Sequence, residues 1–201
     1  MSDQYMIDLG LVSSSGQASE LLSRFVPDLE SVDTVPSKFV SNTWTAINKP
    51  NQLSNGLRGS VLELLVGLSL VRAGITPFFR QAEITYVNNA KFDFLLWEQG
   101  WNPISLSVKT SLRERYKQAE LEAGALQNVH RRSENYLITL EAKEVATRRR
   151  KLEKATEFSN LHRLILADTA EFDELISQLA QKVFAKPKDI NPMGNNLIVA
   201  G

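Results

Sequence analysis

The chain has 201 residues, of which 43% are hydrophobic and 23% charged, the composition of an ordinary globular protein. Lys and Arg total 23, as do Asp and Glu, so net charge gives no support for nucleic-acid binding, which has to be argued from where the charges lie. With no cysteine and only two histidines, His130 and His162, the sequence excludes disulfides and cysteine-ligated zinc, and it argues against a histidine-rich metal site.

Nothing in the sequence predicts targeting to a membrane. Residues 1–15 lack a basic stretch followed by an apolar one. The longest apolar run, at 61–74, is too short to span a bilayer and contains Glu63. We therefore expect a cytoplasmic protein that does not associate with membranes.

The elements predicted along the chain begin with helices and then mix strands with helices. A short helix is predicted at 18–26, a helix or strand at 37–47, and a buried helix at 57–73 that ends at Gly74. Strands at 90–98 and 103–109 are close enough to form an antiparallel hairpin. A helix (112–128), a strand (134–140), a helix (143–158), a strand (161–168) and a helix (171–185) follow.

This order predicts an α/β fold with a central mixed β-sheet flanked by helices. We expect a single domain over 1–201. Within it, residues 1–55 form an N-terminal arm or oligomerisation segment, 56–185 the core, and 186–201 a C-terminal tail with at most one short edge strand.

Three charged residues lie in apolar segments, where charge is costly. Glu63 interrupts the buried helix, Asp93 interrupts the first hairpin strand, and Lys109 ends the second. Each has an ordinary explanation: Glu63 at a rim or paired with Arg58 or Arg72, Asp93 on an edge strand facing water, and Lys109 as a solvated strand end. If the three converge, their carboxylates suit a hard divalent cation such as Mg²⁺, and the ammonium group suits a phosphate.

A resemblance makes that second possibility specific. Asp93 and Ser107-Val108-Lys109 resemble the catalytic half of the PD-(D/E)xK nuclease superfamily, although Phe92 replaces the usual proline and Ser107 the second acid. One branch, the CCGG- and CCNGG-cutting type II restriction endonucleases around EcoRII, uses an S-x-K strand end and carries the missing carboxylate on the following helix. Glu122, 13 residues past Lys109, matches that displaced acid.

The same branch has an (R/K)-(D/E)-R triplet beginning four residues past the lysine, and Arg113-Glu114-Arg115 stands there. An arginine can donate two hydrogen bonds to guanine, and a glutamate can accept one from cytosine N4. The triplet could therefore read neighbouring G·C pairs. The alternative is that Glu114 completes a capping box with Ser111 and that both arginines are solvated.

The resemblance implies a Mg²⁺-dependent, sequence-specific endonuclease of the type II restriction class acting on double-stranded DNA. Asp93, Glu122 and the backbone carbonyl of Val108 would bind the metal, and Lys109 would orient the water and the phosphate. Glu63 would support this site or hold a second metal. Family members form homodimers or higher homo-oligomers, which cut both strands of a palindrome.

Several alternatives stay open. Glu120 could replace Glu122, because the two are about 200° apart around a helix and only one can face the metal. The basic runs 130–132 and 148–151 could contact phosphates or simply be solvated. The protein could also be a structure-selective repair or junction nuclease, or a catalytically inactive DNA-binding protein, which the Ser107 substitution favours.

Overall fold

The computed structural model describes residues 3–48, 53–84, 87, 90–99, 102–113, 115–154, 159–187, 192–193 and 196–199. The helices are α1 (Gln4–Asp8), α2 (Gln17–Ser23), α3 (Pro36–Asn48), α4 (Asn55–Arg72), α5 (Arg115–Val129), α6 (Ala142–Glu153) and α7 (Ala170–Ala180). The strands are β1 (Phe78–Ile84), β2 (Lys91–Glu98), β3 (Asn102–Val108), β4 (Glu134–Thr139), β5 (Arg163–Leu166), β6 (Pro192–Met193) and β7 (Asn196–Ile198).

The strands of the described residues form one mixed sheet in the order β5-β4-β3-β2-β1-β6, with β7 also pairing with β1. The strands β1, β2 and β3 are antiparallel neighbours, whereas β4 is parallel to both β3 and β5. Each parallel connection passes through a helix, α5 between β3 and β4 and α6 between β4 and β5, as parallel pairing requires. The predicted class, a mixed sheet flanked by helices, and the predicted β2–β3 hairpin are confirmed.

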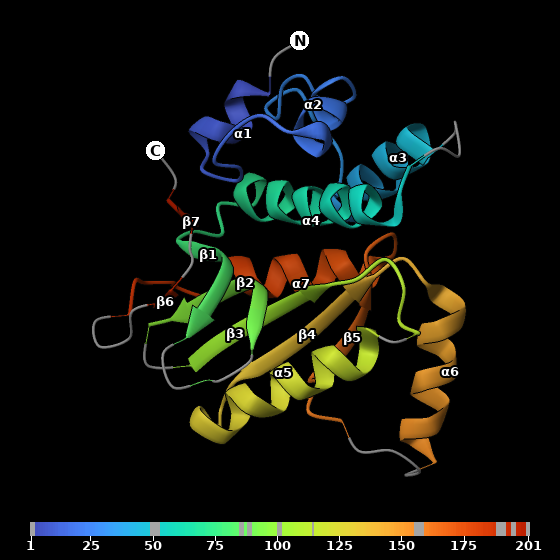
Figure 1. Ribbon diagram of the computed structural model, residues 1–201, viewed down its shortest axis with the longest axis vertical. Coiled ribbons are helices and arrows are strands. Elements are labelled where there is room, and N and C mark those ends of the chain that lie inside the picture. The colour runs from blue at the N-terminus through green and yellow to red at the C-terminus, as the bar shows by residue number, and fades with distance from the viewer. Residues whose placement is uncertain are drawn as a thin grey trace.

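Helices cover both faces of the sheet (Figure 1). The cluster on one face joins Leu65 of α4 and Leu175 of α7 to strand residues such as Leu106. A cluster on the other face joins Ala119 of α5 to Val145 of α6. Because the central strands lie between these layers, charged side chains on them are partly shielded from water.

The N-terminal helices α1, α2 and α3 lie on the side of α4 that faces away from the sheet (Figure 1). Their side chains Met6, Leu22 and Phe39 are buried in the same cluster as Leu65. This packing explains why α4 is apolar nearly all round. Residues 3–48 therefore belong to the main hydrophobic core, and any role for them in oligomerisation stays a prediction.

Local sequence sets the ends and the close packing of α4. The Ser54 hydroxyl accepts a hydrogen bond from the Leu57 N–H at 3.2 Å, a helix N-cap. Gly74 follows the last turn with φ of 68°, a conformation that favours glycine. A Cβ on Gly67 would lie 2.9 Å from Leu11 Cδ2, so glycine allows the N-terminal segment to approach the helix.

Strand β1 and the start of helix α5 differ from the sequence prediction. Strand β1 was not predicted, because Arg80, Gln81 and Glu83 interrupt its apolar residues; its pairing with β2, β6 and β7 stabilises it instead. The helix expected from residue 112 begins at Arg115, so the prediction that Ser111 caps it is wrong. Glu144 of α6 accepts the Leu112 N–H at 2.5 Å and holds this segment as a loop.

Glu114, and with it the capping-box alternative for that residue, lies outside the described residues. Within the described part of the chain, no helix is long and apolar enough to cross a membrane.

Candidate active site

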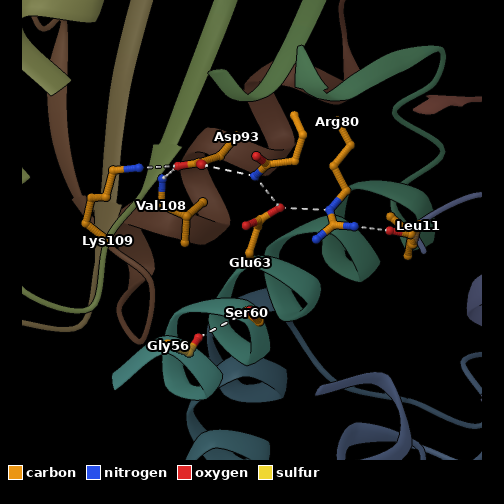
Figure 2. Close-up of polar contacts among 9 residues, drawn as sticks. Leu11, Gly56, Ser60, Glu63, Arg80, Asp93, Val108 and Lys109 are labelled. Carbon is orange, nitrogen blue, oxygen red and sulfur yellow. Dashed lines mark hydrogen bonds and ion pairs between the residues drawn. The ribbon is translucent and has the colours of Figure 1, made fainter. Parts of the chain in front are cut away.

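A buried ion pair lies at the point where the β2–β3 hairpin stops pairing. The β2–β3 pairing ends at Phe94 opposite Leu106, so the Val108 N–H has no backbone partner on β2. Asp93 Oδ2 accepts hydrogen bonds from that N–H at 2.7 Å and from Lys109 Nζ at 2.6 Å (Figure 2). The side chains of Asp93 and Lys109 are only 13% and 8% exposed, so neither is the solvated group of the ordinary explanation.

Asp93 is therefore not on an edge strand, because β2 is hydrogen-bonded to both β1 and β3. Breaking a pair of this kind by removing one partner is strongly destabilising, since the remaining charge stays buried. The carboxylate of Asp93, which interrupts an apolar strand in the sequence, thus has a partly buried charged partner in Lys109.

Glu63 of α4 joins the ion pair through a second set of hydrogen bonds (Figure 2). Its Oε1 accepts from Arg80 Nε at 2.8 Å and from Gln81 Nε2 at 2.9 Å. The same Gln81 Nε2 donates to Asp93 Oδ1 at 3.3 Å. Burial raises the pKa of Glu63, the Arg80 charge opposes the rise, and the Asp93 charge adds to it.

The expected partners of Glu63 were Arg58 and Arg72, and both expectations are wrong. The Arg72 guanidinium donates to the Thr34 carbonyl and lies over the Phe39 ring. The Arg58 guanidinium lies over the Trp44 ring, 5.6 Å from its centroid. Both arginines pack against α3, while Arg80 on β1 lies opposite Glu63 across the helix–sheet interface.

The two candidate glutamates of α5 have different surroundings. Glu120 is hydrogen-bonded to the Ser159 hydroxyl and to the Asn160 N–H, the latter at 2.8 Å. Glu122 is 5% exposed; its Oε1 accepts from Gln118 at 2.8 Å, and its Oε2 is buried without a hydrogen-bond partner.

The electrostatic surroundings of Glu122 include the ion pair. Burial raises the pKa of Glu122, a hydrogen bond from Gln118 opposes the rise, and the nearby charge of Lys109 opposes it as well. The charge of Asp93 raises this pKa further. Glu122 therefore lies within the electrostatic reach of Asp93 and Lys109, whereas Glu120 is committed to residues 159–160.

A cleft of about 700 Å³ opens over the ion pair. Its lining includes Glu63, Asp93, Lys109, Arg113 and Arg115. Both arginines are exposed, so their guanidinium groups are available to a ligand that enters from solvent. Glu122 is not among the lining residues, because it is buried beneath the surface of α5.

The lining also contains residues that sequence reasoning missed, namely Arg58, Gln81 and Glu141. Arg58 and Glu141 carry no local signal, because single charges at helix ends are common on any surface. Gln81 had one indirect signal: with Arg80 it forms a short polar interruption between the apolar pair 78–79 and Ala82.

The candidate metal ligands of this site are carboxylates, the oxygen donors that a hard divalent cation prefers. Among the described residues, no three His, Cys, Asp or Glu side chains lie close enough together to hold a metal ion. Mg²⁺ is commonly held by one or two carboxylates together with water and substrate phosphate oxygens. Asp93 and Glu122 offer two carboxylates, one of them with an unpartnered buried oxygen, and of the two only Asp93 lines the cleft.

Comparisons with known proteins add little. No protein-family model matches the chain, and no curated protein matches it. Among solved structures, the complex of restriction endonuclease PspGI with substrate DNA is similar, with 14% sequence identity and a TM-score of 0.49. The match covers 95% of this chain and 84% of that one. A similarity at this level does not establish function, which depends on the site residues.

Proposed function

We propose that this protein is a Mg²⁺-dependent, sequence-specific endonuclease of the type II restriction class that cuts double-stranded DNA at a short G·C-containing site. The observation that carries the proposal is the contact between Asp93 and Lys109 at 2.6 Å, under a cleft that Arg113 and Arg115 also line. A carboxylate on β2 that can hold a cation thereby lies beside a lysine, directly after β3, that can hold a phosphate.

The proposal gives each residue one role. Asp93, Glu122 and the Val108 carbonyl would hold Mg²⁺, and Glu63 would support Asp93 through the shared hydrogen bonds of Gln81. When bound, Mg²⁺ supplies charge neutralisation at the phosphodiester and lowers the pKa of a water molecule. The Lys109 ammonium, which Asp93 holds at the lining of the cleft, would orient the attacking water and the scissile phosphate.

Base recognition belongs to the loop and helix start that follow Lys109. Arg113 and Arg115 are exposed on the cleft side of this segment, and each can donate two hydrogen bonds to a guanine. Glu114 between them would accept from cytosine N4. A palindromic site would require two copies of the chain, each cutting one strand, so we expect a homodimer or a higher homo-oligomer.

The test is to incubate the purified protein with a long linear DNA of known sequence, in Mg²⁺ and in EDTA. We expect discrete fragments in Mg²⁺ alone, all sharing one end sequence. Lys109→Ala and Lys109→Met, the second of which keeps the aliphatic stem, should slow cleavage by about a hundredfold or more while DNA binding persists.

The matched control is Lys182→Met. Lys182 is also ion-paired, to Glu98 and Glu134, but at the opposite ends of β2 and β4, so this variant should cut at the parent's rate. If the Lys109 variants cut at the parent's rate, the proposed active site is wrong. A smear of fragments would indicate a nuclease that reads DNA shape. Intact DNA in both samples would indicate an inactive DNA-binding protein, which the burial of Glu122 away from the cleft also favours.

A further inference from the structure

The alternation of side chains between the two faces of the sheet inverts at one position shared by β1 and β2. Phe79 of β1 and its partner Leu95 of β2 lie in the cluster that packs beneath α5. Ala82 and its partner Phe92 lie in the same cluster, although Ala82 comes three residues after Phe79 and Phe92 three residues before Leu95. Successive strand residues point to opposite faces, so residues three apart should not share one.

The inversion occurs at Gln81 and Asp93, the two residues that the strand register leaves unpaired between Arg80–Phe94 and Ala82–Phe92. Gln81 has φ of 53°, and among the described residues it is the one non-glycine with a positive φ. A left-handed conformation inside a strand is strained for any residue with a Cβ, and such strain persists where the surrounding structure holds it in place.

The strained residue has a direct consequence at the site. In a regular strand Arg80 and Gln81 would point to opposite faces. Here both side chains reach the same atom, Glu63 Oε1, at 2.8 and 2.9 Å. Gln81 also reaches Asp93 Oδ1 at 3.3 Å, so its amide lies between the two carboxylates.

We propose that Gln81 is a positioning residue, whose side-chain amide, turned inward by the left-handed backbone, holds Glu63 and Asp93 in a fixed relation beneath the cleft. The inference rests on the proposed endonuclease function for its effect on cleavage. The hydrogen-bonding role itself does not depend on it.

The chemistry of the amide suits this role. A glutamine NH₂ group has two hydrogens, so it can donate to two carboxylates at once. It carries no charge, so it adds no further cation that would compete with a metal ion for the two carboxylates. A lysine or arginine in its place would bind the carboxylates more strongly and compete with the metal. Arg80 holds Glu63 from the other side and is itself fixed to the Leu11 carbonyl.

The first experiment compares the stability of alanine and glycine variants at two positions of β1. At Gln81 both substitutions remove the amide, but only glycine adopts the left-handed backbone without strain, so Gln81→Gly should melt at a higher temperature than Gln81→Ala. Glu83 is an exposed position of the same strand with an ordinary backbone, and there the order should reverse, with Glu83→Ala above Glu83→Gly. Alanine at or above glycine at position 81 would overturn the inference.

The second experiment separates positioning from folding and from DNA binding. Single-turnover cleavage by Gln81→Gly should be slower than that of the parent by about tenfold or more, because misplaced acids reduce the rate even when the fold is intact. The dissociation constant for the intact substrate DNA, measured with Ca²⁺ in place of Mg²⁺, should not change. Glu83→Gly should cut at the parent's rate. Cleavage by Gln81→Gly at the parent's rate would overturn the proposal.

A third measurement decides the matter if the parent protein cuts no DNA, an outcome that would reject the proposed function by itself. In NMR spectra of the parent, the Gln81 side-chain NH₂ group should give two distinct, slowly exchanging proton signals. Both Glu63→Gln and Asp93→Asn should shift these signals, because each replaces one of the two carboxylate acceptors with a neutral amide. Signals that respond to neither substitution would show that the amide does not bridge the acids.

Discussion

The three acids of the site differ in how their charge is compensated. Asp93 accepts from the Lys109 ammonium, and Glu63 accepts from the Arg80 guanidinium. Glu122 accepts only from the neutral amide of Gln118, and its second oxygen has no partner. Because an ionised carboxylate is costly to bury without donors, Glu122 lowers the stability of the protein at neutral pH.

This imbalance predicts a stabilising substitution. Burial raises the pKa of Glu122 above its usual value of 4.5, so the native state holds the proton more tightly than the unfolded chain. The stabilisation from this group is complete below the unfolded pKa and is lost as the pH rises through the higher, folded pKa. Glu122→Gln cannot ionise, and in EDTA it should exceed the parent in free energy of unfolding at neutral pH by about 1 kcal/mol or more.

Urea denaturation across a pH series would measure the difference, which should shrink as the pH falls to about 4. The matched control is Glu120→Gln on the same helix. Its carboxylate is satisfied by Ser159 and Asn160, so this variant should be less stable than the parent. A loss of stability in Glu122→Gln at neutral pH would contradict the reasoning.

The two exposed arginines of the cleft predict a change in sequence preference. Arg113→Ala and Arg115→Ala should each weaken binding to the cognate site by about 1–3 kcal/mol, the value of one bidentate guanine contact. Binding to unrelated DNA should change much less. Binding titrations on both DNAs would measure this, with Arg24→Ala, an exposed arginine following α2, as the control for charge loss. Equal losses on both DNAs would make Arg113 and Arg115 phosphate contacts.

At the scale of single elements, α6 presents two different basic faces. Arg149 donates to Glu171 Oε2 at 2.8 Å and to the Leu164 carbonyl at 2.6 Å, so it fastens the helix to β5 and α7. Lys143 is exposed and lines a cavity of about 280 Å³ together with Arg113. Because Arg113 also lines the active-site cleft, this face of α6 extends the basic surface beyond it.

The position of Lys143 predicts a contact with the DNA backbone. Lys143→Ala should reduce the slope of log K against log[salt] by about 0.9, the value for one lost phosphate contact. Sequence preference should stay the same, because phosphate contacts carry no base information. Lys154→Ala, an exposed lysine at the other end of α6 that does not line the cavity, should leave the slope unchanged. If both variants have the same slope of log K against log[salt], Lys143 does not contact the DNA backbone.

At the scale of the whole molecule, the N-terminal segment and the site are one structure. Leu22 and Met6 are fully buried against α4. Arg80 connects the Leu11 carbonyl to Glu63, so the same segment holds part of the proposed active site. The residues before α4 therefore contribute to stability and to site geometry at once.

Leu22→Ala tests this contribution. Removing a fully buried leucine should lower the free energy of unfolding by about 2–5 kcal/mol, measured by chemical denaturation. The same substitution at Leu121, which is 75% exposed on α5, should change it by about 0.5 kcal/mol or less. A small effect at Leu22 would mean that residues 3–48 form an appendage and not part of the core.

The sequence by itself determined the elements whose signals are local. The apolar run of α4, the alternation of β3, the short hairpin connection and Gly74 are contained within a few consecutive residues, and the mixed α/β class followed from their order. It also marked Glu63, Asp93 and Lys109, because a charge in an apolar segment is visible without knowledge of its partner. The roles of these residues in catalysis stay predictions.

Only the tertiary structure decided which groups meet. The pairing of Glu63 with Arg80, the separation of Glu120 from Glu122, and the use of Glu144 to hold Leu112 all join segments that are distant in the sequence or lie on different sides of one helix. Strand β1 has weak local propensity and is stabilised by its neighbours. The backbone of Gln81 has no sequence signal, since the free energy that holds a residue in a strained conformation comes from contacts made by the whole fold.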